Sequence, residues 1–416
     1  MTQDPDVLVA VDVGTTKVCT IVARRVGDEQ FRVVSFSVVP SRGLAKGVVT
    51  DMPDATEAVR SCIQDAARQA ALTVRSAYVG ITGSHVSFDS RSDLIDWAAA
   101  RGVITRDDLD RVPYAVAKAG ARPGREIIHA LPRNYILDGQ GGIRDPIGMH
   151  TRKLEVESHV VSADVSLIRN LTGAVEKSGL EVEALVLEPV ASAEAVLTER
   201  ERYQGAVVVD IGGGTSDVIV FDRGAIELTA ILPIGGFQFT NDICVAYGTD
   251  YGAAEAAKLE HGSTDTTVFK AADEIVLPVP GRVRQRRIPL QELAQLMRER
   301  AVELARMIRL KMVEAGIKDM RSASVVLTGG SSQLPGIDEL FRRQITPNLR
   351  VGGADPRLDV PEALRGPEFA TSVGLLRWAL KQPKGQAGVE PEPSERRPEA
   401  PARTFTSRLR KWLSPR

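Results

Sequence analysis

Cysteine is scarce in this sequence, with Cys19, Cys62 and Cys244 alone among the 416 residues. The number is odd and no two have the short spacing of metal ligands, so we expect neither a disulfide framework nor a zinc module, and a reducing compartment fits. The first residues lack the basic and apolar segments of a signal peptide. No run reaches the ~18 apolar residues of a membrane span. We therefore expect a soluble, cytoplasmic protein.

An excess of positive charge is also missing. The chain has 53 Lys or Arg against 54 Asp or Glu, a net charge of −1. Nucleic-acid-binding proteins usually carry a basic excess, so nucleic acid is not an expected partner. The composition, 43% apolar and 26% charged, is that of an ordinary globular protein, and the length predicts roughly two to three domains.

Strand-like and helix-like segments alternate from about residue 7 to residue 381, which predicts an α/β architecture. The opening pattern returns after residue 205, because VLVAVDVGTTKVCTIVA and AVVVDIGGGTSDVIVFD both contain a strand, an Asp, a Gly–Thr turn and a strand. Two related halves are the simplest interpretation. Residues 84–162 differ, with a helix opened by Thr105 and two long alternating strands, which predicts a small inserted α+β module.

Each half carries a motif typical of phosphate binding, at Asp12–Lys17 (DVGTTK) and Asp210–Asp217 (DIGGGTSD). An aspartate that ends a buried strand can hold Mg²⁺ through water. The glycines after it let backbone N–H groups and hydroxyls approach a phosphate. A single motif is explained equally well as an ordinary turn, but two copies in register are hard to produce by chance. Together they could clamp a triphosphate.

Two further segments suit a nucleoside. The strand and turn of Val325–Ile337 (VVLTGGSSQLPGI) contain glycines against which a flat base could lie. Glu255 and Lys258 share one face of a predicted helix, where they could reach the ribose and base. Standing alone, that pair would be read as a solvated salt bridge.

These motifs resemble, in order, those of the actin, hexokinase and heat-shock-chaperone ATPase superfamily. The resemblance covers about residues 7–381 and implies a two-lobed actin-like ATPase fold that binds ATP and Mg²⁺. The matching segments are the first phosphate loop (Val9–Val18), first connecting helix (Leu185–Leu197), second phosphate loop (Val207–Phe221), adenosine loop (Val325–Ile337) and second connecting helix (Phe369–Trp378).

The resemblance also implies roles for single residues. Asp12 and Asp210 would position Mg²⁺, and Glu188 would orient an attacking water, with Asp210 a weaker catalytic candidate. We expect tight ATP–Mg²⁺ binding and at most slow hydrolysis, because turnover depends on positioning. The implied nucleotide-binding residues are Asp12, Gly14, Thr15, Thr16, Lys17, Gly212, Gly213, Gly214, Thr215, Gly235, Gly236, Glu255, Lys258, Gly329, Gly330 and Ser331.

The inserted module, together with the three loop motifs, resembles the FtsA family of bacterial cell-division proteins, in which it would be subdomain 1C. The implied domains are lobe 1 core (1–83), the insertion (84–163), lobe 1 continued (164–204), lobe 2 core (205–241 and 306–367), outer lobe 2 (242–305), a return helix (368–381), a linker (382–403) and an amphipathic helix (404–416).

The last two segments suit a membrane surface. Residues 382–403 are rich in Pro, Glu and Gly, which predicts a flexible, disordered linker. A basic C-terminus can instead be disordered or dock on its own domain, but the linker favours a detached anchor. An amphipathic helix with an apolar stripe and a basic face would lie on an anionic bilayer. Its residues are Phe405, Arg408, Leu409, Arg410, Lys411, Trp412 and Leu413.

Partners follow from the resemblance. It implies self-association into filaments at the inner face of the cytoplasmic membrane, at the division site, where lobe 2 would bind the acidic C-terminal peptide of the tubulin-like protein FtsZ. Basic candidates for that contact are Arg286, Arg287, Arg298 and Arg300, although a solvated helix face explains any one of them equally well. Downstream division proteins would contact the inserted subdomain.

Three alternatives belong to the same superfamily. A metabolite kinase needs a catalytic base beside an acceptor pocket and has no use for a basic amphipathic tail. The pilus-assembly relative shares the insertion and binds a membrane protein's cytoplasmic peptide, but normally lacks the tail. A chaperone ATPase would need a large substrate-binding domain after the second lobe.

Overall fold

The computed structural model describes residues 4, 6–27, 30–96, 103–143, 145–281, 285–317, 319 and 322–382. They form two compact units, an inserted unit made chiefly of residues 85–169 and a main body made of most of the remainder. The predicted linker and amphipathic helix lie outside the described residues. None of the described helices is both long enough and apolar enough to cross a membrane.

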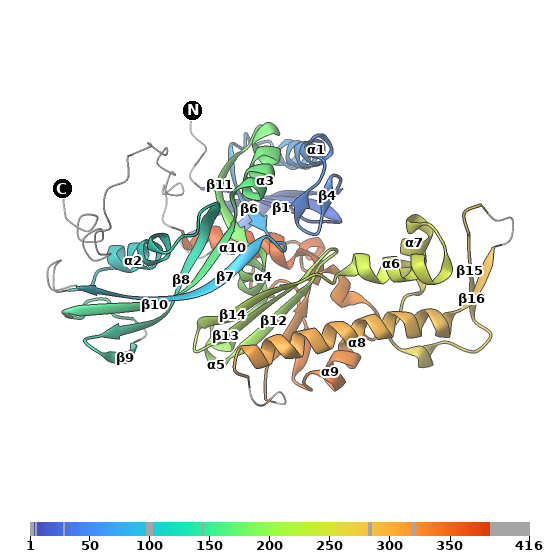
Figure 1. Cartoon of the computed structure of the whole chain (residues 1–416). Helices are drawn as coiled ribbons and strands as arrows, with labels where there is room; N and C mark the ends of the chain where they lie inside the picture. Colours follow the sequence, from blue (N-terminus) through green and yellow to red (C-terminus); the bar gives the residue numbers. More distant parts are fainter. Residues whose placement is uncertain are drawn as a thin grey trace. The chain divides into compact units, whose positions relative to one another are not determined.

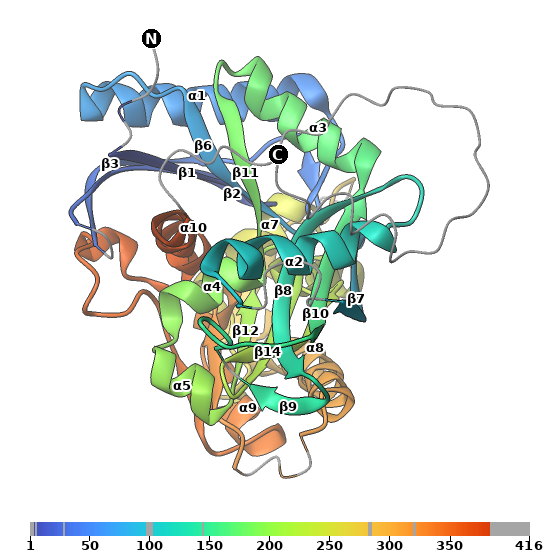
Figure 2. The same ribbon diagram turned by 90° about the vertical axis from the view of Figure 1, so that its left-hand side faces the viewer.

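Lobe 1 of the main body is a five-stranded sheet with helices on both faces (Figure 2). Helix α1 (Met52–Ala70) covers one face over β2 and β3, and α10 (Ala370–Lys381) covers the other. Asp51 caps α1 by accepting a hydrogen bond from the Asp54 N–H, as expected for an N-cap. The strand order is β11 (Glu181–Leu187), β6 (Ser76–Ile81), β1 (Val7–Val13), β2 (Lys17–Arg25) and β3 (Phe31–Pro40).

Lobe 2 repeats this sheet. Its first three strands again form an antiparallel meander and its next two are parallel to the first, so the predicted internal repeat is confirmed. The strand order is β14 (Ala225–Leu232), β13 (Ser216–Asp222), β12 (Ala206–Ile211), β17 (Val325–Thr328) and β18 (Leu349–Val351).

The long helix α8 (Leu290–Glu314) runs beside the lobe-2 sheet (Figure 1). Its buried positions, including Leu293, Met297, Leu304 and Ile308, recur at helical spacing, which places them in one core with the sheet. The predicted domain boundary at residues 305–306 falls inside this helix. The other elements of lobe 2 are α6 (Gly236–Tyr247), α7 (Tyr251–His261), β15 (Glu274–Leu277), β16 (Arg286–Pro289) and α9 (Ile337–Gln344).

Two helices join the lobes. Helix α4 (Glu188–Val196) packs on the lobe-2 sheet and on α10, which packs on the lobe-1 sheet. Their backbones touch, since a Cβ added to Gly374 would lie 1.7 Å from the Ala191 carbonyl oxygen. The sequence predicts a strand over Glu183–Leu187, and this is confirmed, because Leu185–Leu187 pair with β6 as the end of β11. The helix within the matched segment Leu185–Leu197 therefore begins at Glu188. Pro189 in the first turn suits a helix that begins at Glu188.

The described residues of the inserted unit form a four-stranded antiparallel sheet on which helix α2 (Arg106–Ala119) packs. The predicted capping box is present, with Thr105 and Asp108 bonded to each other's backbone N–H. Val112 and Val116 of α2 pack on Leu154 and Val156 of the sheet. The strands are β7 (Val86–Asp96), β10 (Lys153–Asp164), β8 (Arg125–Leu137) and β9 (Gln140–Ile143), of which the sequence did not predict β9.

Four short elements complete the main body. Helix α3 (Val165–Lys177) leads from the inserted segment back to β11, and α5 (Glu199–Gln204) precedes β12. Strands β4 (Leu44–Ala45) and β5 (Val48–Val49) form a small hairpin between β3 and α1.

The contact between α4 and α10 predicts a sharp response to one methyl group. Gly374→Ala should lower the free energy of unfolding by roughly 1–3 kcal/mol, because the new Cβ meets backbone that cannot yield as a side chain would. Urea unfolding of the whole chain measures this.

Gly173→Ala is the matched control. Gly173 also lies within a helix, α3, but no atom of the described residues lies within 4 Å of its added Cβ. That variant should be neutral or more stable by up to about 1 kcal/mol, from helix propensity alone. Equal effects of the two substitutions would contradict the close packing of the connecting helices.

Candidate functional site

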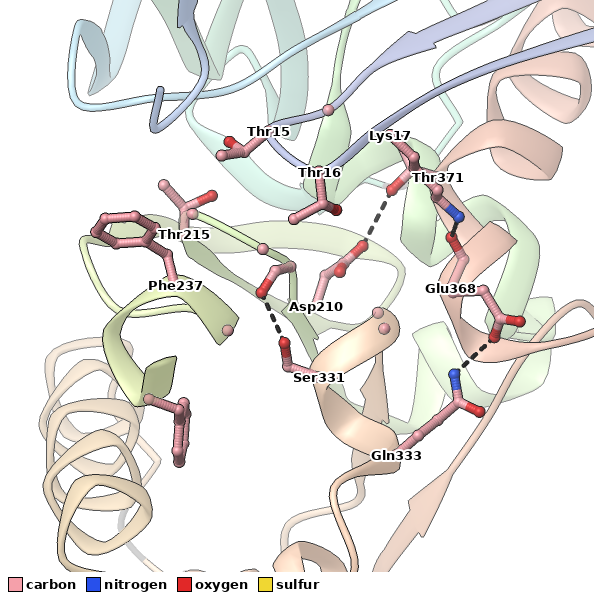
Figure 3. A pocket seen from close by; sticks show the side chains of 18 of the residues that line it. Thr15, Thr16, Lys17, Asp210, Thr215, Phe237, Ser331, Gln333, Glu368 and Thr371 are labelled. Carbon is pink, nitrogen blue, oxygen red and sulfur yellow. Dashed lines mark hydrogen bonds between the residues drawn. The ribbon is translucent and has the colours of Figure 1, made fainter. Parts of the chain in front are cut away.

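Two strand-terminal aspartates, one from each lobe, line a single cavity of about 540 Å³ in the main body. Asp12 precedes the turn between β1 and β2, and Asp210 precedes the turn between β12 and β13. Both side chains, and both turns, were predicted to act together. The structure brings the two repeats onto one site (Figure 3).

Glycine allows the two turns to meet. A Cβ on Gly213 would lie 2.4 Å from Thr16 Cγ2, and one on Gly214 would lie 2.7 Å from Thr15 Oγ1. Gly329 has φ +82°, and its added Cβ would lie 2.2 Å from Asp210 Oδ1. Side chains at these positions would therefore push the phosphate motifs apart or displace the Asp210 carboxylate.

Hydroxyl groups on the connecting helices hold the two aspartates. Ser372 Oγ on α10 donates to Asp12 Oδ2 at 2.7 Å. Thr371 Oγ1 donates to Asp210 Oδ2 at 3.0 Å, and Ser192 Oγ on α4 donates to the same oxygen. The sequence analysis missed these residues. Their one local signal is a polar side chain inside an otherwise buried helix.

Four carboxyl groups gather near the two turns: Asp12 and Asp217 are buried, and Asp210 and Glu188 are half-buried. Burial raises the pKa of both Asp12 and Asp210, against the hydrogen bonds from their hydroxyl partners. Burial, with the nearby Asp210 carboxylate, raises the pKa of Asp217 to about 8. The pKa of Glu188 lies well above its usual range, because the group is buried and faces the negative charges of Asp12, Asp217 and Asp210.

Positive charge offsets only part of the acidic character of this cluster, because Lys17 lowers the pKa of Asp12 and Asp210 but burial raises both by more. Asp217 Oδ2 accepts from Thr82 Oγ1 at 2.8 Å, and within the described part of the chain its buried Oδ1 has no hydrogen-bond partner. Among the described residues, no three Asp, Glu, His or Cys side chains converge as direct ligands of one metal ion. Separated carboxylates that face a common cavity fit a hydrated Mg²⁺, which usually keeps several of its waters in protein sites.

The other end of the cavity carries the predicted adenosine residues. Lys258 Nζ lies 2.7 Å from Glu255 Oε2 and donates to the Gly236 carbonyl oxygen at 3.2 Å. Ser331 Oγ donates to the Gly212 carbonyl oxygen at 2.9 Å. The loop after β17 is thereby tied to the second phosphate turn, and α7 to the start of α6.

Lys17 lies between the phosphate turn and α10. Its Nζ donates to the Glu368 carbonyl oxygen and lies 3.8 Å from the centre of the Phe369 ring. Glu368 Oε2 accepts in turn from Gln333 Nε2 at 2.8 Å (Figure 3). Lys17 is therefore held by the segment that leads into α10.

Of the predicted nucleotide-binding residues, all except Gly235 line the cavity, as does Glu188. Gly235 lies behind it, where an added Cβ would be 2.8 Å from the carbonyl oxygens of Gly212 and Gly213. The sequence analysis did not single out several other lining residues. They are Val13, Gly47, Thr82, Phe237, Phe239, Tyr251, Leu259, Gln333, Leu334, Pro335, Glu368, Phe369 and Thr371.

The four arginines predicted for a partner surface all make contacts within lobe 2. Arg300 forms two 2.7 Å bonds with the Asp242 carboxylate, and Arg298 donates to the Thr264 carbonyl oxygen at 3.2 Å. Arg287 lies 3.5 Å from Glu274, and Arg286 lies over the Tyr247 ring at 5.3 Å. The predicted membrane residues, Phe405 to Leu413, lie outside the described residues.

Comparison with known proteins decides the family. A family model described as "Cell division protein FtsA" matches residues 207–374, and a model of the SHS2 domain inserted in FtsA matches residues 83–162. Cell division protein FtsA of Pseudomonas aeruginosa is 33% identical over 411 residues, which cover 99% of this chain and 98% of that protein. The chain belongs to the FtsA family. FtsA of Escherichia coli K12 is 29% identical over 418 residues, covering 99% and 98%.

Solved structures show the same fold outside the FtsA family. The PilM–PilN type IV pilus biogenesis complex contains a chain with a TM-score of 0.63 and 17% identity, covering 90% of this chain and 99% of that one. MreB 5 of Spiroplasma citri bound to AMPPNP has a TM-score of 0.51 and 14% identity, covering 90% and 96%. The predicted actin-like ATPase fold is confirmed, and the SHS2 match identifies the insertion.

The raised pKa of Asp217 predicts a pH dependence of stability. A carboxyl group whose pKa is higher in the folded state stabilises that state below its unfolded pKa, near 3.8, and the contribution is lost as the pH rises through about 8. Asp217→Asn removes this titration. The free energy of unfolding of the unmodified chain should therefore fall relative to the variant between about pH 4 and pH 8. Urea unfolding without nucleotide or metal tests this, and a difference independent of pH would contradict it.

Proposed function

We propose that the chain binds ATP with Mg²⁺ in this cavity and works as a nucleotide-dependent cell-division scaffold. The convergence of Asp12 and Asp210 from the two lobes carries the proposal. It gives one cavity two glycine-containing turns of the phosphate-binding type and several carboxyl groups whose raised pKa values a bound cation would lower. MreB 5, which has the same fold, is bound to AMPPNP, and this supports a nucleotide as the ligand of the cavity.

In the proposed complex, Asp12 and Asp210 hold the metal ion through water, and Gly14–Thr16 and Gly212–Thr215 hold the phosphates. Gly236, Glu255, Lys258 and Gly329–Ser331 face the nucleoside. The metal supplies the charge that offsets the carboxylates and the phosphates. Glu188 lines the cavity, and burial together with the nearby carboxyl groups raises its pKa well above the usual range, which disfavours the ionised form that would activate a water molecule.

The scaffold is proposed to polymerise at the inner face of the cytoplasmic membrane at the division site. The predicted amphipathic helix, Phe405–Leu413, would bind anionic lipid, and the linker before it would let the body stand off the surface. Lobe 2 would bind the FtsZ C-terminal peptide, and the inserted unit would contact downstream division proteins. Membership of the FtsA family supports this assignment.

The same membership favours this function over the alternatives. The pilus-assembly alternative shares the fold, but the likeness to the PilM–PilN structure is at 17% identity and speaks only for the fold. Rapid multiple turnover with a small-molecule phosphate acceptor would favour a metabolite kinase.

A single carboxylate tests the nucleotide site. Asp210→Ala should abolish ATP binding or its dependence on Mg²⁺, because the aspartate and its two hydroxyl partners stand where the proposed metal is held. Isothermal titration with ATP, with and without Mg²⁺, measures this.

Asp222→Ala is the control for that substitution. Asp222 ends the same hairpin on β13, but its side chain is exposed and does not line the cavity. It should bind as the unmodified chain does. Unchanged ATP–Mg²⁺ affinity in Asp210→Ala would contradict the assignment of the second phosphate turn.

Co-sedimentation with anionic liposomes tests the tether. The full chain and a version ending at Gln382 would each be spun with and without ATP–Mg²⁺ at low salt. Only the full chain should pellet with the liposomes, and ATP should increase the pelleted fraction because linked weak anchors gain avidity. If neither version pelleted, the tail would not be an anchor, and the kinase and pilus-type functions would gain support.

A further inference from the structure

The hairpin of β4 and β5 ends in a turn with an unusual residue. Ala45 pairs with Val48, so the loop consists of Lys46 and Gly47 alone, with φ of 49° and 76°. A two-residue loop with both φ angles positive is a type I′ turn, in which Asn, Asp or Gly normally takes the first position. A lysine there adopts a left-handed conformation that its side chain disfavours. The turn geometry therefore does not explain the lysine.

The turn of this hairpin contacts both lobes at the cavity. A Cβ on Gly47, which lines the cavity, would lie 2.4 Å from the Thr82 carbonyl oxygen at the end of β6. On the other side, a Cβ added to Gly214, in the second phosphate turn, would lie 3.0 Å from the Lys46 Cα. The backbone of Lys46 is thus fixed beside the loop proposed to hold phosphate.

The base of the hairpin is fixed as well. The N–H groups of Thr50 and Asp51 both donate to the Gly43 carbonyl oxygen, at 2.8 and 3.1 Å. A Cβ on Gly43 would lie 2.3 Å from the Asp51 carbonyl oxygen. Asp51 is the N-cap of α1, so a rigid helix end positions the turn that carries Lys46.

Charge makes Lys46 the cation best suited to this end of the cavity. Lys258 is paired with Glu255 at the nucleoside end, and Lys17 is bonded to the Glu368 carbonyl group and Phe369. Lys46 is exposed and takes part in none of the ion pairs found within the described part of the chain. A lysine ammonium on its four-carbon stem can follow a mobile phosphate as a point charge.

In the proposed complex, a nucleoside against Glu255, Lys258 and Ser331 would place the phosphate chain along the two turns. The terminal phosphate would then lie where Gly214 meets both Thr15 and Lys46. It would add about two negative charges to a region that already holds four carboxyl groups.

We propose that Lys46 recognises the terminal phosphate and so determines the preference of the cavity for nucleoside triphosphate over diphosphate. The assignment rests on the proposed function, since it needs a cavity that binds ATP. It adds a specificity-determining residue from the hairpin of lobe 1, outside the two phosphate turns.

Lys46→Asn is the decisive variant, because Asn removes the charge yet favours the type I′ turn. ATP–Mg²⁺ affinity should fall about tenfold, as expected for loss of a charge-assisted hydrogen bond, while ADP–Mg²⁺ affinity changes little. Lys46→Arg, which keeps the charge, should retain most of the ATP preference. Titration calorimetry of the full chain with each nucleotide gives both affinities.

Lys270→Asn is the matched control. It makes the same change of charge at another exposed lysine of the main body, whose neighbours in the sequence do not line the cavity as Gly47 does, and should leave both affinities unaltered. If Lys46→Asn weakened ATP and ADP binding equally, or weakened neither, the proposed role of Lys46 would be overturned, but the proposal that the unmodified chain binds ATP would stand. Failure of the unmodified chain to bind either nucleotide would overturn the proposed function, and this assignment with it.

Discussion

The backbone contact between α4 and α10 is the constraint on which the site depends. Gly374 lets α10 lie directly on Ala191 of α4, and each helix packs on the sheet of a different lobe. That crossing delivers Ser372 to Asp12, and both Thr371 and Ser192 to Asp210. The two aspartates are thereby oriented by the element that joins the lobes. The turns alone would leave their carboxylates free to choose other rotamers.

This arrangement gathers acidic groups whose charge Lys17 offsets only in part. Charged groups removed from water destabilise a fold unless they are paired or protonated. Here the pKa values of Glu188 and Asp217 are raised, and Asp217 Oδ1 has no hydrogen-bond partner among the described residues. A bound cation and its nucleotide would relieve this penalty, so ligand binding and stability are linked. Strongly raised pKa values of several carboxyl groups in one cavity are typical of a functional site.

The sequence predicted what depends on local pattern. Each phosphate turn consists of a few consecutive residues, so Asp12, Asp210 and their glycines could be identified from the sequence. The repeat of the motif predicted two lobes with the same topology. Ser192 and Thr371 could not be found, because their role depends on a helix crossing between residues 179 positions apart.

Some residues at the site have no sequence signal that distinguishes them from residues of an ordinary surface turn. Lys46–Gly47 reads as a surface turn, and nothing nearby in the sequence links it to Gly214, which is far along the chain. Gly235 shows the opposite case, because it belongs to a glycine pair beside the cavity yet fills space behind the second turn. Glycine marks close approach of backbone in both cases, but only the fold shows whether a ligand or another strand makes that approach.

The proposed membrane tether depends on the combined binding of many weak sites. A single short amphipathic helix binds a bilayer weakly and reversibly, so one molecule would exchange rapidly with the cytoplasm. A filament presents many such helices on linkers, and each bound helix raises the effective concentration of the next. Membrane occupancy then depends steeply on filament length. If nucleotide controls polymerisation, a small energetic signal at Asp12 and Asp210 becomes a large change in attachment, without any contact between the cavity and the tail.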